Sequence, residues 1–285
     1  MSLDLAAIRA AAVRIAPHIT RTPVLTNEAL DRASGASLFF KCENLQPAGA
    51  FKSRGACNAV FALSDAEAAR GVVTHSSGNH GAAVARAAQR RGVPGYIVMP
   101  HNASKSKVRN VESFGGSIIY CESSLKAREA ACAQVMAETG AVLVHPFDNY
   151  AVMAGQGTAT LELLEEIPDL DLILCPVGGG GLLCGTAIAA KGIRAGIKVI
   201  GVEPELANDV AQSFRARQLV SIATPATIAD GLRTNETGEK NLPIILEHVD
   251  DVVTVTEEAI VTAMRTLWEQ LRILIEPSSA VPFAA

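Results

Sequence analysis

The feature that most constrains the fold of this chain is a regular alternation between short apolar runs and longer stretches of helical period. The apolar runs are SLFFKC (37–42), GVVTH (71–75), YIVM (96–99), SIIYC (117–121), AVLVH (141–145), LDLILC (170–175), IKVIGV (197–202) and DVVTV (251–255). The helical stretches include 79–91, 104–113, 124–138, 156–166, 182–194 and 256–272. This alternation predicts βαβ units, and therefore an α/β fold with largely parallel sheets flanked by helices.

The length of the chain predicts two lobes. At 285 residues the chain exceeds the usual size of a single domain. Residues 64–149 hold four strand–helix units in succession. We expect them to form a small domain inserted into a large domain that is built from residues 1–63 and 150–285.

Composition excludes several classes of protein. Hydrophobic residues make up 49% and charged residues 19% of the chain, as in ordinary folded proteins. A net charge of -4 argues against nucleic-acid binding, which needs a concentrated basic face. No apolar run reaches the roughly 18 residues of a membrane span, and the N-terminal residues after Asp4 predict an amphipathic helix rather than a signal peptide.

The six cysteines indicate a reducing compartment. None forms a C-x-x-C pair, and most stand inside apolar runs such as LILC and LLCG. Buried free thiols are therefore expected rather than disulfides, and the cytoplasm is the expected location.

A run of four glycines, Gly178–Gly181, stands directly after LDLILC and directly before a helical stretch. Glycine lets the backbone approach a bound group closely, and the N–H groups at a helix N-terminus favour an anion. A G-x-G-x-x-G dinucleotide motif fails because its last position falls on Leu183 or Cys184, and the P-loop lysine is missing. A flexible turn is the simpler alternative, but the position favours phosphate binding.

A polar loop, THSSGNHG (74–81), also lies between an apolar run and a helical stretch. Asn79 or Ser77 could cap the following helix, and capping would explain one polar residue. Together with Ser76 and His80 the group is larger than a cap requires. It indicates a loop that grips a carboxylate or an aromatic hydroxyl.

Lys52 lies in LQPAGAFKSRGACNAV (45–60), after a glycine-containing turn and before a stretch that looks mostly buried. A lone lysine is usually a solvated surface charge. Burial at this position would lower the pKa of its amine and make it nucleophilic enough to form a Schiff base.

These three loops, in this order, resemble the fold-type II pyridoxal-phosphate enzymes, most closely the serine racemase and serine/threonine dehydratase family. The resemblance covers nearly the whole chain. It is carried by TPVLT (22–26), FFKCENLQ (39–46), AFKSRGACNAV (50–60), VVTHSSGNHG (72–81), HPFDN (145–149), AGQGT (154–158), PVGGGG (176–181), GVEP (201–204), IADGLRT (228–234) and LIEPSSA (274–280).

The resemblance implies two lobes, each with a mostly parallel twisted sheet, and a cofactor, pyridoxal 5'-phosphate, bound by the large domain. Lys52 would form the Schiff base and move the α-proton on one face of the cofactor. Gly178, Gly179, Gly180 and Gly181 would cradle the phosphate, and Asn79 would hold the pyridoxal hydroxyl.

The polar loop would receive the substrate carboxylate through Ser76, Ser77 and His80. Ser77 stands where serine racemases place a serine base on the opposite face of the cofactor. Threonine dehydratases usually have alanine there, so the resemblance favours the racemase-like branch. Arg128 matches an arginine that reaches the distal end of the substrate, although a solvated helix charge is an equal alternative.

Glu203 and Asp209, with the carbonyl of Ala207, match a divalent-cation site of that branch. Such hard oxygen ligands suit Mg²⁺ or Ca²⁺. Without the resemblance, these residues would be interpreted as a surface loop.

The implied activity is dehydration of a small, serine-like hydroxy amino acid to a keto acid and ammonia, or its racemisation, because the cofactor ring acts as an electron sink. A dehydratase of threonine or threo-3-hydroxyaspartate, a sulfur-transferring relative, and a non-catalytic homologue that binds a cofactor or metabolite are alternatives. A homodimer is expected from the resemblance alone. An S-x-x-K pattern at 104–107 suggests a penicillin-binding enzyme, but the S-D-N and K-T-G signatures of that family are absent.

Two departures from the family pattern affect these expectations. Residues 47–50 lack the lysine and hydroxyl residues of nucleotide-activated racemases, and Phe114 replaces their tyrosine, so ATP activation is not expected. The family also continues beyond the E-P-S-S-A segment, to a Ser-Gly-Gly-Asn-like turn that contacts the pyridine nitrogen. The large domain is therefore expected to be shortened at its C-terminus.

Overall fold

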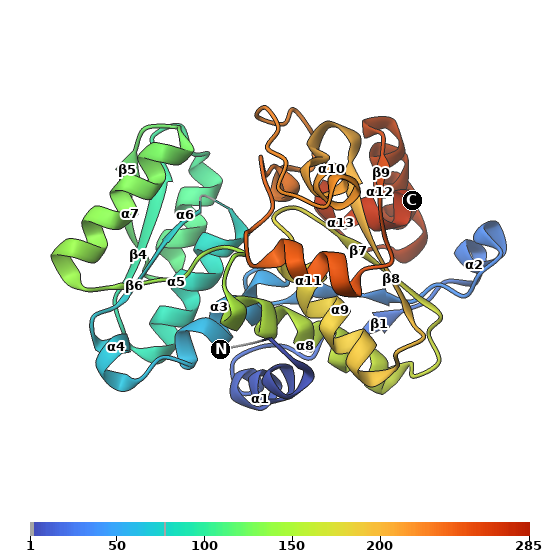
Figure 1. Cartoon of the computed structure of the whole chain (residues 1–285), viewed down its shortest axis with the longest axis horizontal. Coiled ribbons are helices and arrows are strands. Elements are labelled where there is room, and N and C mark those ends of the chain that lie inside the picture. Colours follow the sequence, from blue (N-terminus) through green and yellow to red (C-terminus); the bar gives the residue numbers. More distant parts are fainter. Residues whose placement is uncertain (1–2, 77) are drawn as a thin grey trace.

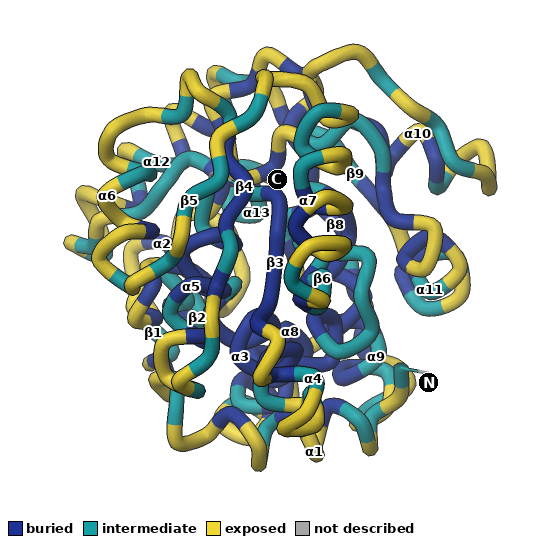
Figure 2. Tube along the Cα trace, turned by 90° about the vertical axis from the view of Figure 1, so that its left-hand side faces the viewer, coloured by how far each residue is buried: buried dark blue, intermediate teal, exposed yellow. Residues whose placement is uncertain are grey.

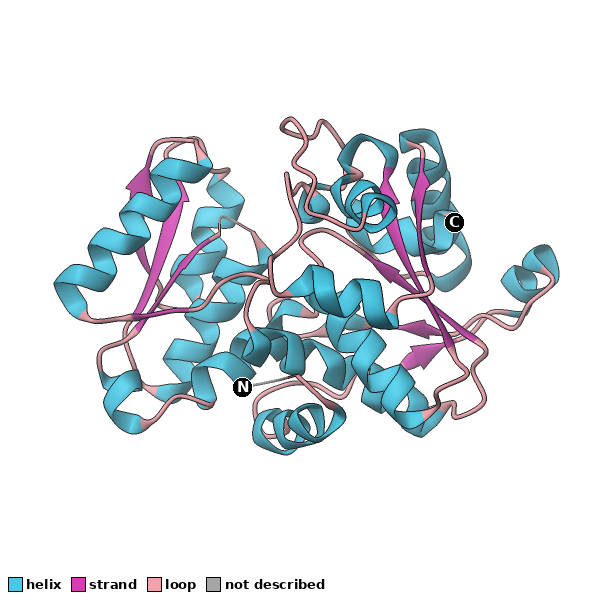
Figure 3. Ribbon diagram, viewed as in Figure 1, coloured by secondary structure: helices cyan, strands magenta, loops and turns pink. Residues whose placement is uncertain are grey.

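The computed structural model of the protein describes residues 3–76 and 78–285. Their strands form two larger parallel sheets and one short antiparallel ribbon, drawn in magenta in Figure 3. The two larger sheets lie towards opposite ends of the long axis of the molecule, and helices flank both of them (Figure 1).

The first sheet has four parallel strands in the order β5-β4-β3-β6. Its strands are β3 (Val72–His75), β4 (Gly95–Pro100), β5 (Ser117–Cys121) and β6 (Val142–Leu143). The helices between them are α5 (Asn79–Arg91), α6 (Lys105–Ser113) and α7 (Leu125–Thr139). β3 pairs on both sides and is buried throughout, as Figure 2 shows. Of the polar residues 74–81, Thr74 and His75 end this strand and Asn79, His80 and Gly81 open α5, so the two elements take most of the segment that was predicted as a loop.

The second sheet has three parallel strands in the order β7-β8-β9. Its strands are β7 (Leu172–Pro176), β8 (Lys198–Pro204) and β9 (Asp251–Val255). The helices that accompany it are α9 (Gly181–Ile193), α10 (Asp209–Ala216), α11 (Asn241–His248), α12 (Glu257–Leu271) and α13 (Pro277–Ala284). Val199, Val252 and Leu183 belong to the core between this sheet and its helices.

The remaining elements come from the first part of the chain and from the segment between the two sheets. They are α1 (Leu5–Ile15), β1 (Val24–Leu25), α2 (Glu28–Ser34), β2 (Phe40–Lys41), α3 (Lys52–Phe61), α4 (Asp65–Ala69) and α8 (Tyr150–Glu166). β1 and β2 form the antiparallel ribbon.

Glycines bring α3, α8 and α9 unusually close together. A Cβ on Gly155 of α8 would lie 2.6 Å from the Arg54 carbonyl oxygen of α3. A Cβ on Gly185 of α9 would overlap the Met153 carbonyl oxygen of α8. Because helices can approach this closely only without side chains at the contact, these glycines determine where α3 presents its first residue, Lys52.

The predicted fold class is confirmed, since both larger sheets are parallel and flanked by helices. α8 begins at Tyr150 rather than at 156, because the Asn149 side chain caps it by accepting from the N–H groups of Ala151 and Val152. The predicted strand 37–42 is reduced to β2. The helices α2, α4, α10 and α11 were not predicted, and all of them are short.

The four-stranded sheet comes entirely from residues 72–143 and the three-stranded sheet from residues 172–255. The division into a small domain, 64–149, and a large domain of 1–63 and 150–285 stays a proposal. All six cysteines are free, and all except the half-buried Cys121 are buried. Within the described part of the chain, no helix combines the length and apolar character needed to cross a bilayer.

Candidate active site

Lys52 is the first residue of α3, and its side chain is turned into the protein. Its Nζ donates a hydrogen bond of 2.8 Å to the carbonyl oxygen of Pro146. Burial lowers the pKa of Lys52 to about 8, and the nearby Glu276 carboxylate partly offsets this effect. An amine that loses its proton near pH 8 is a far better nucleophile at neutral pH than an ordinary lysine.

The first turn of α3 is held by buried ion pairs. Arg54 is fully buried, and its guanidinium contacts Glu43 and Glu162 at 2.7 Å each. Glu162, which lies on α8, also pairs with Lys41 at 2.7 Å. Two positive and two negative charges therefore compensate one another around Arg54, two residues after Lys52. Because these ion pairs fix the first turn of α3, they also fix the position of Lys52.

The glycine run joins β7 to α9. Gly180 has φ +93°, in the left-handed region that favours glycine, and Gly181 opens α9. A Cβ on Gly179 would overlap the ring of Phe147. A Cβ on any glycine of this run would lie within 3.2 Å of other protein atoms, so a side chain fits here only if its neighbours shift. The run leads into the N-terminus of α9, where backbone N–H groups favour an anion.

The loop between β6 and α8 lies between Lys52 and the glycine run. Pro146 accepts the hydrogen bond from Lys52, and a Cβ on Gly181 would lie 3.1 Å from Cα of Phe147. His145, in the same loop, accepts the N–H of Asp148 at its Nδ1 (2.8 Å). Lys52 and the glycine run thus contact one short loop, which brings the expected amine and phosphate positions together.

The polar loop after β3 is only partly described. Ser76 accepts the N–H of Gly78 at 3.3 Å, whereas Ser77 lies outside the described residues. His80 is buried, and its Nε2 donates to the carbonyl oxygen of Val144 (3.0 Å), which leaves Nδ1 as an acceptor. Burial, and then the charge of Lys52, lowers the pKa of His80 well below its usual range. His80 is therefore neutral and lies close to Lys52.

Asn79 is the first residue of α5, and its Nδ2 donates to both carboxylate oxygens of Glu276, at 3.0 and 2.9 Å. Glu276 is the N-cap residue of α13, so this contact joins the two halves of the chain. Burial raises the pKa of Glu276, and the hydrogen bond from Asn79 opposes that rise. A Cβ on Gly231 would lie 3.3 Å from Glu276 Oε1, which places the carboxylate beside the IADGLRT segment.

Sequence reasoning assigned no role to Glu276 or Phe147, although both stand in segments that carried the resemblance. Each of the two residues nevertheless has a local sequence feature that could have identified it as a candidate. Glu276 is a carboxylate that directly follows the apolar residues ILI (273–275), and Phe147 is an aromatic residue that closely follows the apolar run 141–145.

Arg128 lies on α7 and is not brought into contact with Lys52. Its Nε donates at 3.4 Å to the Ser124 carbonyl of its own helix. Its charge nevertheless contributes, after burial, to the lowered pKa of His75, which ends β3 next to the polar loop. Arg128 therefore lies near the edge of the candidate site, not inside it.

The predicted cation ligands lie at the end of β8 and the start of α10. Glu203 is buried, and its carboxylate accepts the N–H groups of Val210 (3.2 Å) and Ala211 (2.7 Å). Burial, and then the charge of Asp209, raises the pKa of Glu203 well above its usual range. Burial raises the pKa of Asp209 to about 7.

Ala207 is also fully buried, in the short turn between these two carboxylates. Two buried carboxylates whose pKa values burial raises suit a divalent cation, which would compensate both charges.

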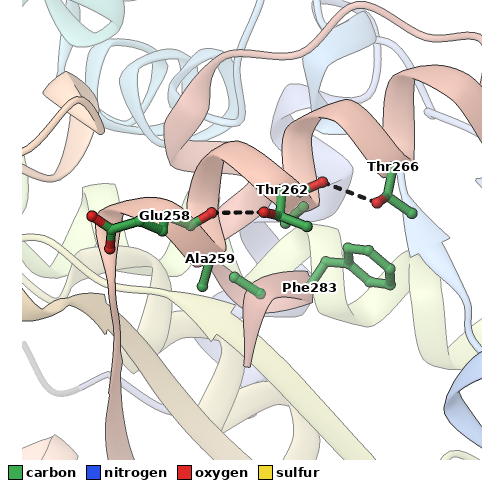
Figure 4. Close-up of a pocket in the computed structure, with 7 residues that line it drawn as sticks. Glu258, Ala259, Thr262, Thr266 and Phe283 are labelled. Atoms are coloured by element: carbon green, nitrogen blue, oxygen red, sulfur yellow. Dashed lines mark hydrogen bonds between the residues drawn. The ribbon is translucent and has the colours of Figure 1, made fainter.

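Two grooves on the surface contain none of the predicted site residues. One, of about 350 Å³, lies between α12 and α13 and is shown in Figure 4. The other lies along α6 and is lined by Ser106, Lys107, Arg109 and Asn110. In α6, Ser104 caps its helix and Lys107 pairs with Asp230 at 2.6 Å, so the S-x-x-K residues have structural partners.

Residues 15–285 match the family model described as "Pyridoxal-phosphate dependent enzyme". The serine racemase of Oryza sativa subsp. japonica is 50% identical over 282 residues, which are 99% of this chain and 83% of the relative. The beta-hydroxyaspartate dehydratase of Paracoccus denitrificans is 46% identical over 275 residues, 96% of this chain and 87% of the relative. The solved structure of maize serine racemase superposes with a TM-score of 0.98 and 48% identity, covering 100% of this chain and 86% of that chain.

Proposed function

We propose that this chain, which belongs to the pyridoxal-phosphate-dependent enzymes, racemises or dehydrates a small, serine-like hydroxy amino acid. The observation that supports this most directly is the shared loop at 145–148. It contacts a buried amine with a pKa of about 8 on one side and a glycine-lined helix N-terminus on the other.

The described residues fit pyridoxal 5'-phosphate. The glycine run leads into the N-terminus of α9, and a helix N-terminus stabilises an anion by about 0.3–1 kcal/mol. Lys52 offers an amine that is largely desolvated. When bound, the cofactor withdraws electrons from the α-carbon of the amino acid and so acidifies its α-proton.

Each candidate residue then has one task. Lys52 holds the cofactor and moves the α-proton on one face, and Ser77 carries a proton on the opposite face. Ser76 and His80 belong to the loop that receives the substrate carboxylate. Asn79 holds the pyridoxal hydroxyl, and the Glu276 carboxylate orients its amide.

Two outcomes follow from one arrangement of bases. If the β-hydroxyl leaves after the α-proton, the product hydrolyses to a keto acid and ammonia. If a proton returns from the Ser77 face, the product is the other enantiomer. The ratio of racemisation to dehydration therefore depends on how well Ser77 delivers its proton.

The test uses both serine enantiomers with wild type, Lys52→Ala and Ser77→Ala. We expect the purified wild-type protein to show the visible absorbance of the bound cofactor and Lys52→Ala to lose it together with all turnover. Ser77→Ala should suppress racemisation but keep some dehydration of the enantiomer whose α-proton faces Lys52. Ser113→Ala is the matched control, because among the described residues this exposed serine hydroxyl bonds to the Asn110 carbonyl alone, near the end of α6. Unchanged racemisation in Ser77→Ala would contradict the two-base assignment.

A second candidate substrate is threo-3-hydroxyaspartate, which carries a second carboxylate. The similarity to the Paracoccus dehydratase and the position of Arg128 near the polar loop favour it. We expect Arg128→Ala to raise KM for hydroxyaspartate about tenfold or more while changing KM for serine little. Lys126→Ala, an exposed residue of the same helix, is the control. Equal effects on both substrates would remove Arg128 from the site.

We further propose that Glu203, Asp209 and the carbonyl of Ala207 bind Mg²⁺ or another divalent cation. The donor set supports this, because it consists of oxygens and holds two buried carboxylates. We also propose that the protein forms a homodimer, that it has the two domains described above, and that it is located in the cytoplasm. Sedimentation tests the dimer, limited proteolysis tests the division into domains, and localisation of the tagged protein tests the cytoplasmic location.

A further inference from the structure

The carbonyl oxygen of Gly179 accepts three hydrogen bonds from one short segment. Asn241 Nδ2 donates at 2.6 Å, Thr237 Oγ1 at 3.1 Å and the backbone N–H of Gly238 at 3.3 Å. Thr237 and Asn241 are both buried. Three donors on a single carbonyl hold that peptide group in one orientation.

The orientation of this peptide decides where the next N–H group points. A trans peptide is planar, so the N–H of Gly180 is directed opposite to the C=O of Gly179. The N–H therefore points away from residues 237–241. Donors on the carbonyl also polarise the peptide and strengthen its N–H as a donor. Thr237 and Asn241 are thus positioning residues for the glycine run, although neither was part of any sequence motif.

The other end of the same segment contacts the proposed cation site. The Thr234 hydroxyl donates to the two carboxylate oxygens of Asp209, at 3.3 and 3.4 Å. These bonds are long, and Asp209 shares its surroundings with the buried carboxylate of Glu203. A cation that draws the Asp209 carboxylate into one position would also restrict Thr234.

We propose that residues 234–241 couple the cation site to the phosphate cradle, so that a divalent cation at Glu203 and Asp209 tightens binding of the cofactor. This inference rests on the proposed function. The segment is short, and it is bonded to Asp209 at one end and to Gly179 at the other. Lys240 ties it in addition to the loop beside Lys52, because its backbone N–H donates to Asp148 at 3.0 Å.

The test measures the dissociation constant of pyridoxal 5'-phosphate from the apoprotein by equilibrium dialysis, with saturating Mg²⁺ and with chelator. In wild type we expect Mg²⁺ to tighten binding about tenfold, within the usual range of allosteric coupling. By thermodynamic reciprocity, the cofactor must tighten Mg²⁺ binding by the same factor, which calorimetry measures independently.

Two pairs of variants examine the two ends of the segment. In Thr234→Val, Mg²⁺ should no longer change the dissociation constant of the cofactor, and the dissociation constant measured in chelator should equal that of wild type. Thr234→Ser should restore the effect of Mg²⁺. Thr237→Val should weaken cofactor binding severalfold, and Thr237→Ser should restore it. Thr262→Val is the control, because the Thr262 hydroxyl bonds only to the Glu258 carbonyl of its own helix (Figure 4).

The outcomes separate this proposal from the proposed function. A wild-type protein that binds no cofactor contradicts the function itself. A wild-type protein that binds the cofactor equally well with and without Mg²⁺ overturns the coupling alone, as does an unchanged Mg²⁺ effect in Thr234→Val. If Thr234→Val fails to fold, Thr237→Val decides the matter: wild-type cofactor affinity in that variant overturns the proposed coupling.

Discussion

At the scale of single residues, burial of ionisable groups accounts for most of the chemistry of this protein. Lys52, His80 and Glu276 lie close to one another. Burial lowers the pKa of Lys52 and of His80 and raises the pKa of Glu276, so in each case it favours the neutral form of the side chain. Arg54 differs because burial, which by itself lowers its pKa, is outweighed by the hydrogen bonds and charges of Glu43 and Glu162, so its pKa is raised. Removing Arg54 would leave Glu43 without its cationic partner and Glu162 with Lys41 alone, at a cost of about 3–5 kcal/mol.

The desolvated amine of Lys52 predicts a pH-dependent stability of the apoprotein. Its pKa is about 8 in the folded state, whereas a fully solvated lysine, as in the unfolded chain, has a pKa of 10.5. Between these values the unfolded chain binds more protons, so this group makes the folded state more stable as pH rises from 8 to 10.5. Below pH 8 it destabilises the fold by about 3 kcal/mol.

We therefore expect Lys52→Met apoprotein to be more stable than wild type at pH 7, by up to about 3 kcal/mol less the lost bond to Pro146. The difference should shrink as pH approaches 10. Denaturant unfolding at several pH values measures it, with the exposed Lys126→Met as control. A constant difference across this range would show that the amine of Lys52 is not buried.

At the scale of elements, the packing of α3, α8 and α9 carries the site. Gly55 and Gly155 meet between α3 and α8, and Gly157 and Gly185 meet between α8 and α9. Helical glycine is unfavourable by about 1 kcal/mol compared with alanine, so four glycines at crossing points indicate that close approach outweighs helix propensity here. Lys52 begins α3 and Gly181 begins α9, so this packing contributes to the position of both beside the loop at 145–148.

We expect Gly185→Ala to destabilise the protein by about 1–3 kcal/mol, because its Cβ would overlap backbone atoms of Met153 and Gly157, which cannot yield as a side chain would. The added strain should also displace α3 and weaken cofactor binding. Gly196→Ala is the control, since nothing lies within 4 Å of its Cβ position. Equal unfolding midpoints for the two variants would show that the helices do not depend on this contact.

At the scale of the whole molecule, polar contacts connect the parts that carry the two sheets, and two of them join residues far apart in the chain. Asn79 bonds to Glu276, and Lys107 pairs with Asp230. The Lys107–Asp230 pair is about 40% exposed on both sides, so it contributes at most about 1 kcal/mol. The residues of the proposed cation site lie in the second part.

We expect Mg²⁺ to raise the unfolding temperature of the wild-type apoprotein, because a cation that binds only the folded state stabilises it by about 2.7 kcal/mol at one hundred times its dissociation constant. Asp209→Asn should lose this response. In chelator, the same variant should be at least as stable as wild type, since it removes a buried uncompensated charge. Differential scanning calorimetry with and without chelator measures both effects, and a wild type that ignores chelator would remove these residues from the site.

The sequence by itself determined the fold class and the loops that carry the chemistry. The strands β3, β4, β5, β7, β8 and β9 and the helices α5, α6, α7, α9 and α12 agree with their predicted ranges to within a few residues. They could be predicted because buried parallel strands are continuous apolar runs and their helices keep a clear period. Lys52 and the glycine run could also be identified from local sequence, because their residue types and their positions after a turn and after a strand can be read without knowledge of the tertiary structure.

Only the tertiary structure decided which of these residues meet. The pairing of Asn79 with Glu276 spans almost two hundred positions of the chain, and no local pattern specifies it. The contact of Phe147 with Gly179, and the donors Thr237 and Asn241 on the Gly179 carbonyl, are equally non-local. Burial follows from the packing of all the elements together, so the lowered pKa of Lys52 became definite only once the chain was folded.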